Sequence, residues 1–584
     1  MLFLPRRILE FPGFEQTHRR SKFHLQMLTT LWIAVLVTAS LGAVTLFIRR
    51  KQFPLPPGPR GIPIVGNLRD LPSPTQKDWL HWLKHKDQYG PISSLSVLGT
   101  HIIILNDARL AVQLLEKRSS IHSMRPQQNF TDMSGWNNVL GARRNPEHVR
   151  KTRKYLYQEI GSKKSVSAFD HVQRAEVSHF LLRLLNDPSK LQQHIRKWVY
   201  CVLDRQAMIN ANMSREAGGI VLKIGYDYTI EQHDRDPLVD LADKAMEDFS
   251  IALLPATWAV DFIPMCKCKP GRSYSMLLTM LIVKYLPTWF PGAKFKTIAA
   301  EFNRRQQAFS DIPYEFVKQQ MKKNCAPSFL SNLLQDNPLE HGSEEENIVK
   351  WSAGSLYAGG ADTTVSSIAS FFLAMALFPE AQRKAQHELD TVLGEKQLPQ
   401  FDDRENLPYI NALVKEVLRW HPVVPVNLVH TSNEDDICEG YFIPKGSSIL
   451  ANIWAFTHDP EVYHEPMVFN PDRFLASSDQ VPERDPHLLV FGFGRRACPG
   501  RTLADANVFL TLAQTLAVFN ISKPLSKGDR DLEYDFIPGV ISHPAPFDVS
   551  IQPRSDGHRE LIVSLEESYP WEKSDADLLP SVQI

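Results

Sequence analysis

One cysteine of this chain stands in a segment suited to binding a metal through a thiolate. Cys498 follows two arginines and lies among three glycines in the sequence FGFGRRACPG, residues 491–500. Glycine lets backbone N–H groups come close to a sulfur, and such hydrogen bonds tune a metal-bound thiolate. The arginines can donate charge-assisted hydrogen bonds to carboxylates on the bound group. The alternative is a glycine- and arginine-rich loop around a buried free cysteine.

A second segment, AGGADTT at residues 358–364, places unusual residues inside a predicted helix. The flanking pattern predicts one long helix from Glu344 to about Phe378. Two adjacent glycines inside it cost about 1 kcal/mol each relative to alanine. They suggest that a flat object packs against the backbone, and the Thr363 hydroxyl can bond a preceding carbonyl and open the helix locally. The alternative is a glycine-kinked core helix in which Asp362 is a cap.

The two segments together resemble those of the cytochrome P450 family, the haem-thiolate monooxygenases. The pattern F-x-x-G-x-R-x-C-x-G is typical of the family's ligand loop. The resemblance implies that Cys498 is the axial ligand of the iron in haem b. The positions that match the pattern are Phe491, Gly494, Arg496, Cys498 and Gly500.

The resemblance also implies roles for Asp362 and Thr363, which match the family's [A/G]-G-x-[D/E]-T-[T/S] motif. Thr363 would position water and hydrogen-bond to oxygen at the iron, and Asp362 would gate protons toward it. Cleaving O₂ requires two protons at the distal oxygen, and a dry pocket supplies none by itself.

Three further residues resemble the family's buried ion triad. Glu416 and Arg419 are three positions apart, so on a helix they share a face and can pair. The later segment FNPDRF places Arg473 in the family's F-x-P-x-R-F pattern. By resemblance the three side chains form a buried cluster that fixes one packing arrangement. Loss of one member would leave an unpaired buried charge.

His430, Arg496 and Arg153 are expected, by resemblance, to contact the haem propionates. The family usually has a tryptophan four residues before the last of these, where this chain has Val149. The tyrosine–glycine element that precedes it in related chains is replaced by GARRNPEHV. The sequence therefore predicts that one propionate donor is missing and that the loop before this helix has diverged.

The composition predicts a single large catalytic domain. The chain has 584 residues, is 43% hydrophobic and contains no linker or internal repeat. Its 65 Lys and Arg residues balance 65 Asp and Glu residues, which gives no indication of nucleic-acid binding. The patterns predict a β-hairpin from residues 92–98 and 101–105, helices through most of residues 175–393, and short strands at 441–442 and 448–450. The expected fold is mainly α with small β-sheets, of the cytochrome P450 type.

The six cysteines have irregular spacings that do not resemble a disulfide framework, so a reducing, cytosol-facing compartment is expected. Cys266 and Cys268 form a C-x-C motif among lysines. A metal site there would need further ligands, which the neighbouring sequence lacks, so surface thiols are expected.

Residues 27–48 contain no charged residue and predict one transmembrane helix, long enough to cross about 30 Å of hydrocarbon. A signal peptide and a buried core helix are the alternatives. Basic residues lie on both sides, so the positive-inside rule does not decide the orientation. The predicted parts are an N-terminal extension (1–26), the anchor (27–48), a basic and proline-rich hinge (49–67) and the catalytic domain (68–584).

This order resembles membrane-bound cytochromes P450 of the endoplasmic reticulum, which are single-pass proteins with a cytosolic catalytic domain. The resemblance implies electrons from NADPH through a flavoprotein, NADPH-cytochrome P450 reductase, docked on the basic residues near 495–501. With this topology none of the N-x-[S/T] sites would be glycosylated. These sites are Asn129, Asn212 and Asn520.

Five mostly apolar segments are expected, by resemblance, to line the distal pocket: residues 133–140, parts of 251–262, 352–358, 423–428 and 540–543. Their apolar character favours a hydrophobic small molecule as substrate. The candidate side chains are Trp136, Trp258, Tyr357, Val424, Val426 and Val540.

The predicted function is a monooxygenase that hydroxylates or otherwise oxidises this molecule. The chain most resembles fungal members of the family, many of which act in secondary-metabolite biosynthesis. The alternatives are a haem-thiolate isomerase, dehydratase or peroxygenase that needs no reductase, and a non-enzymatic haem binder. Asp362 and Thr363 favour O₂ activation over these alternatives.

Overall fold

The computed structural model describes residues 53–579 with gaps at 74, 189–210, 232–234, 255–256, 263–287, 290–292, 324–325, 337–338, 479–480 and 525–533, together with residues 32, 37 and 38. The predicted extension and all but three residues of the predicted anchor lie outside the described residues. So do Cys266 and Cys268. The described chain forms a small unit, residues 53–56 and 435–443, and a large unit that holds the remaining residues from Pro57 onward.

The small unit contains a two-stranded antiparallel sheet of β4 (Asp436–Cys438) and β5 (Tyr441–Ile443). Glu439 and Gly440, which connect the strands, have φ angles of 49° and 77°. Positive φ at both positions is the geometry of a type I′ turn, which matches the twist of the strands it joins. The N–H of Phe442 donates to the carbonyl of Pro54 at 2.8 Å.

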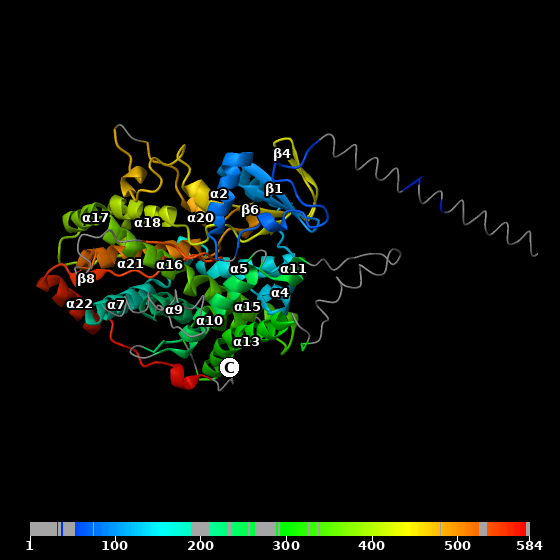
Figure 1. Ribbon diagram of the computed structural model, residues 1–584. Coiled ribbons are helices and arrows are strands. Elements are labelled where there is room, and N and C mark those ends of the chain that lie inside the picture. The colour runs from blue at the N-terminus through cyan, green and yellow to red at the C-terminus, as the bar shows by residue number, and fades with distance from the viewer. Residues whose placement is uncertain are drawn as a thin grey trace, which may run out of the picture. The chain divides into compact units, whose positions relative to one another are not determined.

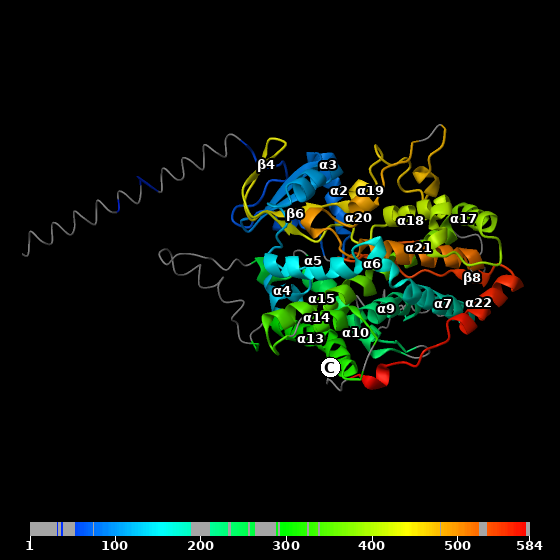
Figure 2. The ribbon, with the colours of Figure 1, turned by 180° about the vertical axis from the view of Figure 1, so that it is seen from behind.

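The large unit is mainly helical, and Figures 1 and 2 show its helices from two sides, with α22 beside α7 in both views. The helices are α2 (Asp78–Tyr89), α3 (Ala108–Ala111), α4 (Asn129–Met133), α5 (Pro146–Ile160), α6 (Lys163–Ser167), α7 (Asp170–Asn186), α9 (Ala211–Tyr226), α10 (Pro237–Leu253), α11 (Ala259–Phe262), α13 (Lys294–Met321), α14 (Phe329–Asp336), α15 (Glu344–Ala361), α16 (Thr363–Leu377), α17 (Pro379–Val392), α18 (Pro408–Trp420), α19 (Ile453–Thr457), α20 (His487–Val490), α21 (Arg501–Val518) and α22 (Asp556–Ser568).

A four-stranded sheet of the large unit has the order β1-β2-β6-β3. The strands are β1 (Ile92–Val97), β2 (Thr100–Leu105), β3 (His430–Thr431) and β6 (Ser448–Ala451), and a second sheet pairs β7 (Phe519–Ser522) with β8 (Ser550–Pro553). The predicted hairpin around Gly99 is confirmed, because β1 and β2 pair antiparallel from Ile92 opposite Leu105 to Val97 opposite Thr100. Strand β6 runs parallel to β2 and brings β3, with His430, into the same sheet.

The predicted long central helix is present in two parts, because α15 ends at Ala361 and α16 begins at Thr363. Asp362 between them has φ −117° and ψ −34°, outside regular helical geometry. By length and composition the span Glu344–Leu377 could cross a membrane, but 78% of its most apolar window is buried inside the protein. It is therefore a core element, and α5, α9, α13 and α14 pack against α15.

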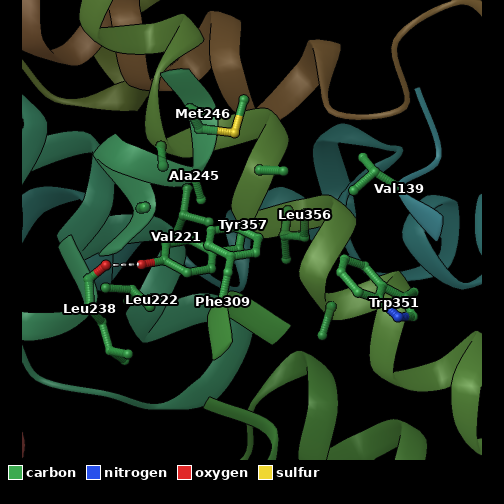
Figure 3. Close-up of a cluster of buried hydrophobic side chains, with 14 of the residues drawn as sticks. Val139, Val221, Leu222, Leu238, Ala245, Met246, Phe309, Trp351, Leu356 and Tyr357 are labelled. Atoms are coloured by element: carbon green, nitrogen blue, oxygen red, sulfur yellow. Dashed lines mark hydrogen bonds between the residues drawn. The ribbon is translucent and has the colours of Figure 1, made fainter. Parts of the chain in front are cut away.

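Several aromatic residues expected in the distal pocket belong instead to the hydrophobic core. The Tyr357 ring stacks on Phe309, with centroids 4.4 Å apart, and its hydroxyl donates to the carbonyl of Leu238, as Figure 3 shows. Trp136 is fully buried. Trp258 is only partly buried and packs against this core, with its ring stacked on another aromatic ring at a centroid distance of 3.5 Å. Since core and pocket positions are equally apolar, the composition of these segments did not distinguish them.

Candidate active site

Cys498 lies in the loop between α20 and α21, and the backbone closes tightly around it. The Cys498 N–H donates to the carbonyl of Phe491 at 2.7 Å. Gly494 has a φ of +53°, and a Cβ at this position would lie 2.5 Å from the carbonyl oxygen of Leu115. A side chain is therefore excluded at Gly494 by both conformation and space.

The pKa of the Cys498 thiol is subject to opposing influences. Burial raises its pKa above the usual value, while the N–H of Gly500 and the charges of Arg153 and Arg501 lower it. A metal ion that bound the sulfur would displace the thiol proton. Within the part of the chain that the structure describes, no group of three His, Cys, Asp or Glu side chains could hold a metal ion. A metal at Cys498 would therefore need most of its ligands from an organic group.

The Cys498 side chain is exposed to an internal cavity of about 340 Å³. Gly359, Gly360 and Thr363, from the break between α15 and α16, also border this cavity. The remaining wall is mostly apolar. Its apolar side chains include Val139, Leu140, Leu156, Ile160, Ile220, Val221, Met246, Phe249, Leu356, Val423, Val424, Leu428, Val540 and Ile541.

The two adjacent glycines of α15 serve different purposes. A Cβ at Gly359 would meet no atom within 4 Å, so its absence leaves a flat backbone surface facing the cavity. A Cβ at Gly360 would lie 2.3 Å from Cγ2 of Val221 on α9. Only Gly359 therefore fits the expectation of a flat object against the backbone, and Gly360 permits close packing of two helices.

Three arginines, here called the cavity arginines, also border the cavity: Arg125, Arg153 and Arg496. Burial and, to a smaller extent, the charge of Arg153 lower the pKa of Arg496 to about 10. Burial and the charge of Arg496 hold the pKa of Arg125 well below its usual value. Buried cations that repel one another are stabilised by an anion placed among them.

The hydrogen bonds of the cavity arginines go to neutral backbone carbonyls. Arg496 donates to the carbonyls of Ser123, Leu140 and Arg143 at 2.9 to 3.3 Å. Arg153 donates to that of Ala497 at 2.7 Å. These bonds orient the guanidinium groups but leave their charges uncompensated.

His430 borders the same cavity and has a fixed tautomer. Its Nδ1 lies 2.7 Å from the carbonyl oxygen of His122, so Nδ1 carries the proton. Burial and the charge of Arg125 hold the pKa of His430 well below its usual value. His430 would donate from Nε2 only as an imidazolium, which a neighbouring carboxylate would favour.

The sequence does not predict Arg125 as a site residue. Arg125 nevertheless supplies a cation at the cavity, whereas Val149 stands where the family usually has a donor to a propionate. Val149 is buried on α5 and has no donor side chain. The Nε of Arg125 is buried without a hydrogen-bond partner among the described residues. The available signal was an arginine directly before Pro126 in a polar loop. A thiol, a flat backbone surface and buried cations around one cavity fit haem, a flat dianionic group that carries iron.

Asp362 and Thr363 lie at the helix break but differ in surroundings. Thr363 Oγ1 donates to the carbonyl of Gly359 at 2.6 Å, and Thr363 borders the cavity. The residues lining the cavity do not include Asp362. Its Oδ1 lies 3.0 Å from Nε2 of His543, a partner that the sequence reasoning did not identify.

Glu416, Arg419 and Arg473 lie together and are at most 2% exposed. Arg419 binds Glu416 through two nitrogens at 2.7 and 2.8 Å, and Nε of Arg473 lies 3.3 Å from Glu416 Oε1. Glu483, which the sequence reasoning missed, binds Arg473 at 2.7 Å. The four residues, here called the ion cluster, contain two positive and two negative charges.

The residues that line the substrate side of the cavity are only partly those that the sequence predicts. The predicted segments contribute Leu140, Val424 and Val540, whereas Val426 does not border the cavity. Helices α9 and α10 also contribute, through residues such as Ile220 and Phe249, and their sequences carried no signal beyond helical periodicity.

The chain matches a protein-family model described as cytochrome P450 over residues 56–551. Cytochrome P450 monooxygenase ppsD of Aspergillus oryzae is 47% identical over 534 residues, which are 91% of this chain and 94% of the relative. O-methylsterigmatocystin oxidoreductase of Aspergillus flavus is 43% identical, covering 90% of this chain and 92% of the relative. Cytochrome P450 monooxygenase claR of Ampulloclitocybe clavipes is 42% identical, covering 97% and 98%. The chain therefore belongs to the cytochrome P450 family of haem-dependent oxidoreductases, and it is a monooxygenase.

Proposed function

We propose that this monooxygenase binds haem b through Cys498 and inserts one oxygen atom from O₂ into a hydrophobic small molecule. The observation that carries the proposal is the Cys498 thiol facing a cavity that Gly359 and Thr363 also border. Haem with a thiolate ligand supplies the electron density that favours O–O cleavage.

The cavity arginines and His430 would hold the propionates of this haem. The three arginine charges have backbone carbonyls as partners, so two carboxylates would compensate two of these charges. The glycines of the ligand loop allow the backbone to approach the sulfur. The ion cluster would hold α18 and the segment around Arg473 together without contact to the substrate.

Thr363 and Asp362 would supply protons to the oxygen side of the cavity. Thr363 borders the cavity, and its Oγ1 would hold a water there while it donates to the carbonyl of Gly359. Asp362 would carry protons from the His543 side of the helix break to that water. The apolar wall would exclude other water, so protons arrive only by this route.

The substrate is proposed to be a largely apolar secondary metabolite of fungal type. The wall of the cavity is predominantly aliphatic and aromatic, which suits such a guest. The printed name of one relative states a substrate, O-methylsterigmatocystin, and that compound is the first one to test.

The electrons would come from NADPH through NADPH-cytochrome P450 reductase, docked near residues 495–501. Residues 27–48 would anchor the chain in the endoplasmic reticulum membrane as a single pass, with the catalytic domain (68–584) in the cytosol. The remaining parts would be the extension (1–26) and the hinge (49–67).

The first test is the absorption spectrum of the reduced protein with carbon monoxide, compared with Cys498→Ser. Loss of the far-red thiolate band in this variant is expected, and Cys438→Ser, at a buried cysteine of the small unit, is the matched control. NADPH and reductase should then support product formation from O-methylsterigmatocystin or a related compound. Turnover with hydrogen peroxide but none with NADPH and reductase would favour a peroxygenase instead. An unchanged spectrum in Cys498→Ser would contradict thiolate ligation.

A further inference from the structure

Five charged side chains form a second cluster beside the ligand loop, here called the His487 cluster. The imidazole of His487 lies between two carboxylates, with Nδ1 2.8 Å from Asp485 and Nε2 2.9 Å from Asp505. Burial alone would lower the pKa of His487, but these two carboxylates raise it to about 9. The imidazole is therefore a cation at neutral pH, paired on both sides.

The two carboxylates are in turn held by cations from other elements. Arg404 binds Asp505 through two nitrogens at 2.7 and 3.0 Å. Lys415 of α18 lies 3.0 Å from Asp485, next to Glu416 of the ion cluster. The His487 cluster is thus fixed to α18, the helix that also carries Glu416 of the ion cluster.

The position of the His487–Asp505 pair in the chain gives it a specific consequence. His487 is the first residue of α20, directly before the ligand loop, and Asp505 lies in the first turns of α21, directly after it. The pair therefore joins the two ends of the loop that carries Cys498. Holding both ends reduces the conformations available to a loop.

His487 also contacts the loop itself. Its ring stacks on that of Phe491, with centroids 5.7 Å apart and planes inclined by 24°. The carbonyl of Phe491 accepts the hydrogen bond from the Cys498 N–H. A displacement of His487 would therefore reach the backbone of Cys498 through one intervening residue.

We propose that His487 is a positioning residue for the thiolate: by pairing with Asp485 and Asp505 it closes the ligand loop and keeps the Cys498 sulfur bound to iron. The inference rests on the proposed function in one respect, that Cys498 is the axial ligand. Partners outside the ligand sphere commonly contribute 10- to 100-fold to metal binding by orienting the ligand.

The test compares His487→Ala, His487→Gln, Asp505→Asn and the double variant His487→Ala/Asp505→Asn. Glutamine retains a side-chain N–H that can reach Asp505, so it is the conservative replacement. His464→Ala is the matched control, because His464 is 87% exposed in a loose pair with Glu465. The measurements, all per mole of bound haem, are the fraction with the thiolate band in the reduced carbon monoxide complex and the rate at which this band is lost.

We expect His487→Ala to lose the thiolate band roughly tenfold faster than the unsubstituted protein. This is the lower end of the 10- to 100-fold effect that residues which orient a metal ligand commonly have. Asp505→Asn should behave similarly, the double variant should add little, and His487→Gln should lie in between. The proposal is overturned if all variants retain the unsubstituted rate. It is also overturned if haem content falls together with the unfolding midpoint while the remaining haem keeps its thiolate. Absence of the thiolate band in the unsubstituted protein would overturn the proposed function, and this inference with it.

Discussion

The ion cluster and the cavity arginines both bury positive charge, but they balance it differently. Each arginine of the ion cluster has a carboxylate within 3.3 Å, and both arginines are at most 2% exposed. The cavity arginines donate to backbone carbonyls instead. A buried charge that the chain itself neutralises serves the fold, and one that it leaves unbalanced is prepared for a ligand.

The largest effect is expected from breaking the ion cluster. Glu416→Gln removes the carboxylate that both Arg419 and Arg473 contact, and it leaves one buried guanidinium charge uncompensated, because Glu483 still pairs with Arg473. The free energy of unfolding should fall by about 3 to 5 kcal/mol, measured by urea denaturation. Asp472→Asn breaks an exposed pair with Lys384 and should cost no more than about 1 kcal/mol. Equal losses in the two variants would contradict the structural role of the cluster.

The His487 cluster lies between these extremes, because each of its cations has a carboxylate partner but the cluster is only partly buried, and its stability should depend on pH. The pKa of His487 is raised from 6.5 to about 9, so its contribution is fully present below pH 6.5 and is lost as the pH rises through 9. The pKa of Asp505 is lowered to about 2, so its contribution remains until the pH falls below its usual value. The loss between pH 6.5 and 9 should reach at most about 3 kcal/mol.

Urea denaturation at several pH values measures this loss, and His487→Gln should flatten the alkaline part of the profile. An equally steep decline in the variant would assign the pH dependence to other groups.

Removal of a cavity arginine should stabilise the haem-free protein, whereas removal of a charge from the ion cluster should destabilise the protein. Arg125→Met removes an unbalanced buried cation, so the haem-free protein should become more stable by about 1 kcal/mol. The same variant should release haem roughly tenfold faster, measured by transfer to a haem-scavenging globin. Arg109→Met is the control, because Arg109 is 85% exposed and pairs with Asp107. A haem-free protein that loses stability in Arg125→Met would remove the distinction between the two kinds of buried charge.

The smallest effect on stability is expected at the helix break. Thr363→Ala removes the hydroxyl that borders the cavity, and this single hydrogen bond should contribute about 1 kcal/mol or less to stability. Coupling should change more, with several-fold less product and more hydrogen peroxide per NADPH oxidised. Ser370→Ala, which removes a similar bond to the helix backbone at Ser366, is the matched control. Unchanged coupling in Thr363→Ala would contradict a role for this hydroxyl in proton supply.

Much of the fold could be predicted where local pattern and local geometry agree. Alternating residues around Gly99 specify the β1–β2 hairpin, since a residue with positive φ is needed there. The glycines, aspartate and threonines of residues 358–364 specify a helix that opens, and the helix breaks at Asp362. Both features depend on neighbours in sequence, which is why the sequence predicts them.

The residues of the candidate active site could be predicted only where they belong to a sequence motif. No motif identifies His543 or Glu483, and the local signal at Arg125 is no more than its place before Pro126. Their roles come from groups that only the folded chain brings near them. The segments that contain Trp136 and Tyr357 predict pocket positions for them, yet both side chains lie in the core. A large apolar side chain is equally suited to either place, so hydrophobicity does not choose between them.

By itself the sequence determined the residue types that do the chemistry: a thiol in a glycine loop, a hydroxyl and a carboxylate in a weakened helix, and arginines nearby. These follow from short-range spacing, which fixes local conformation and chemical character. Only the tertiary structure decided which charges are balanced and which are not, because charge balance depends on side chains brought within about 3 Å from distant segments. That same packing separates the ion cluster, the His487 cluster and the cavity arginines, which are composed of the same kinds of residue.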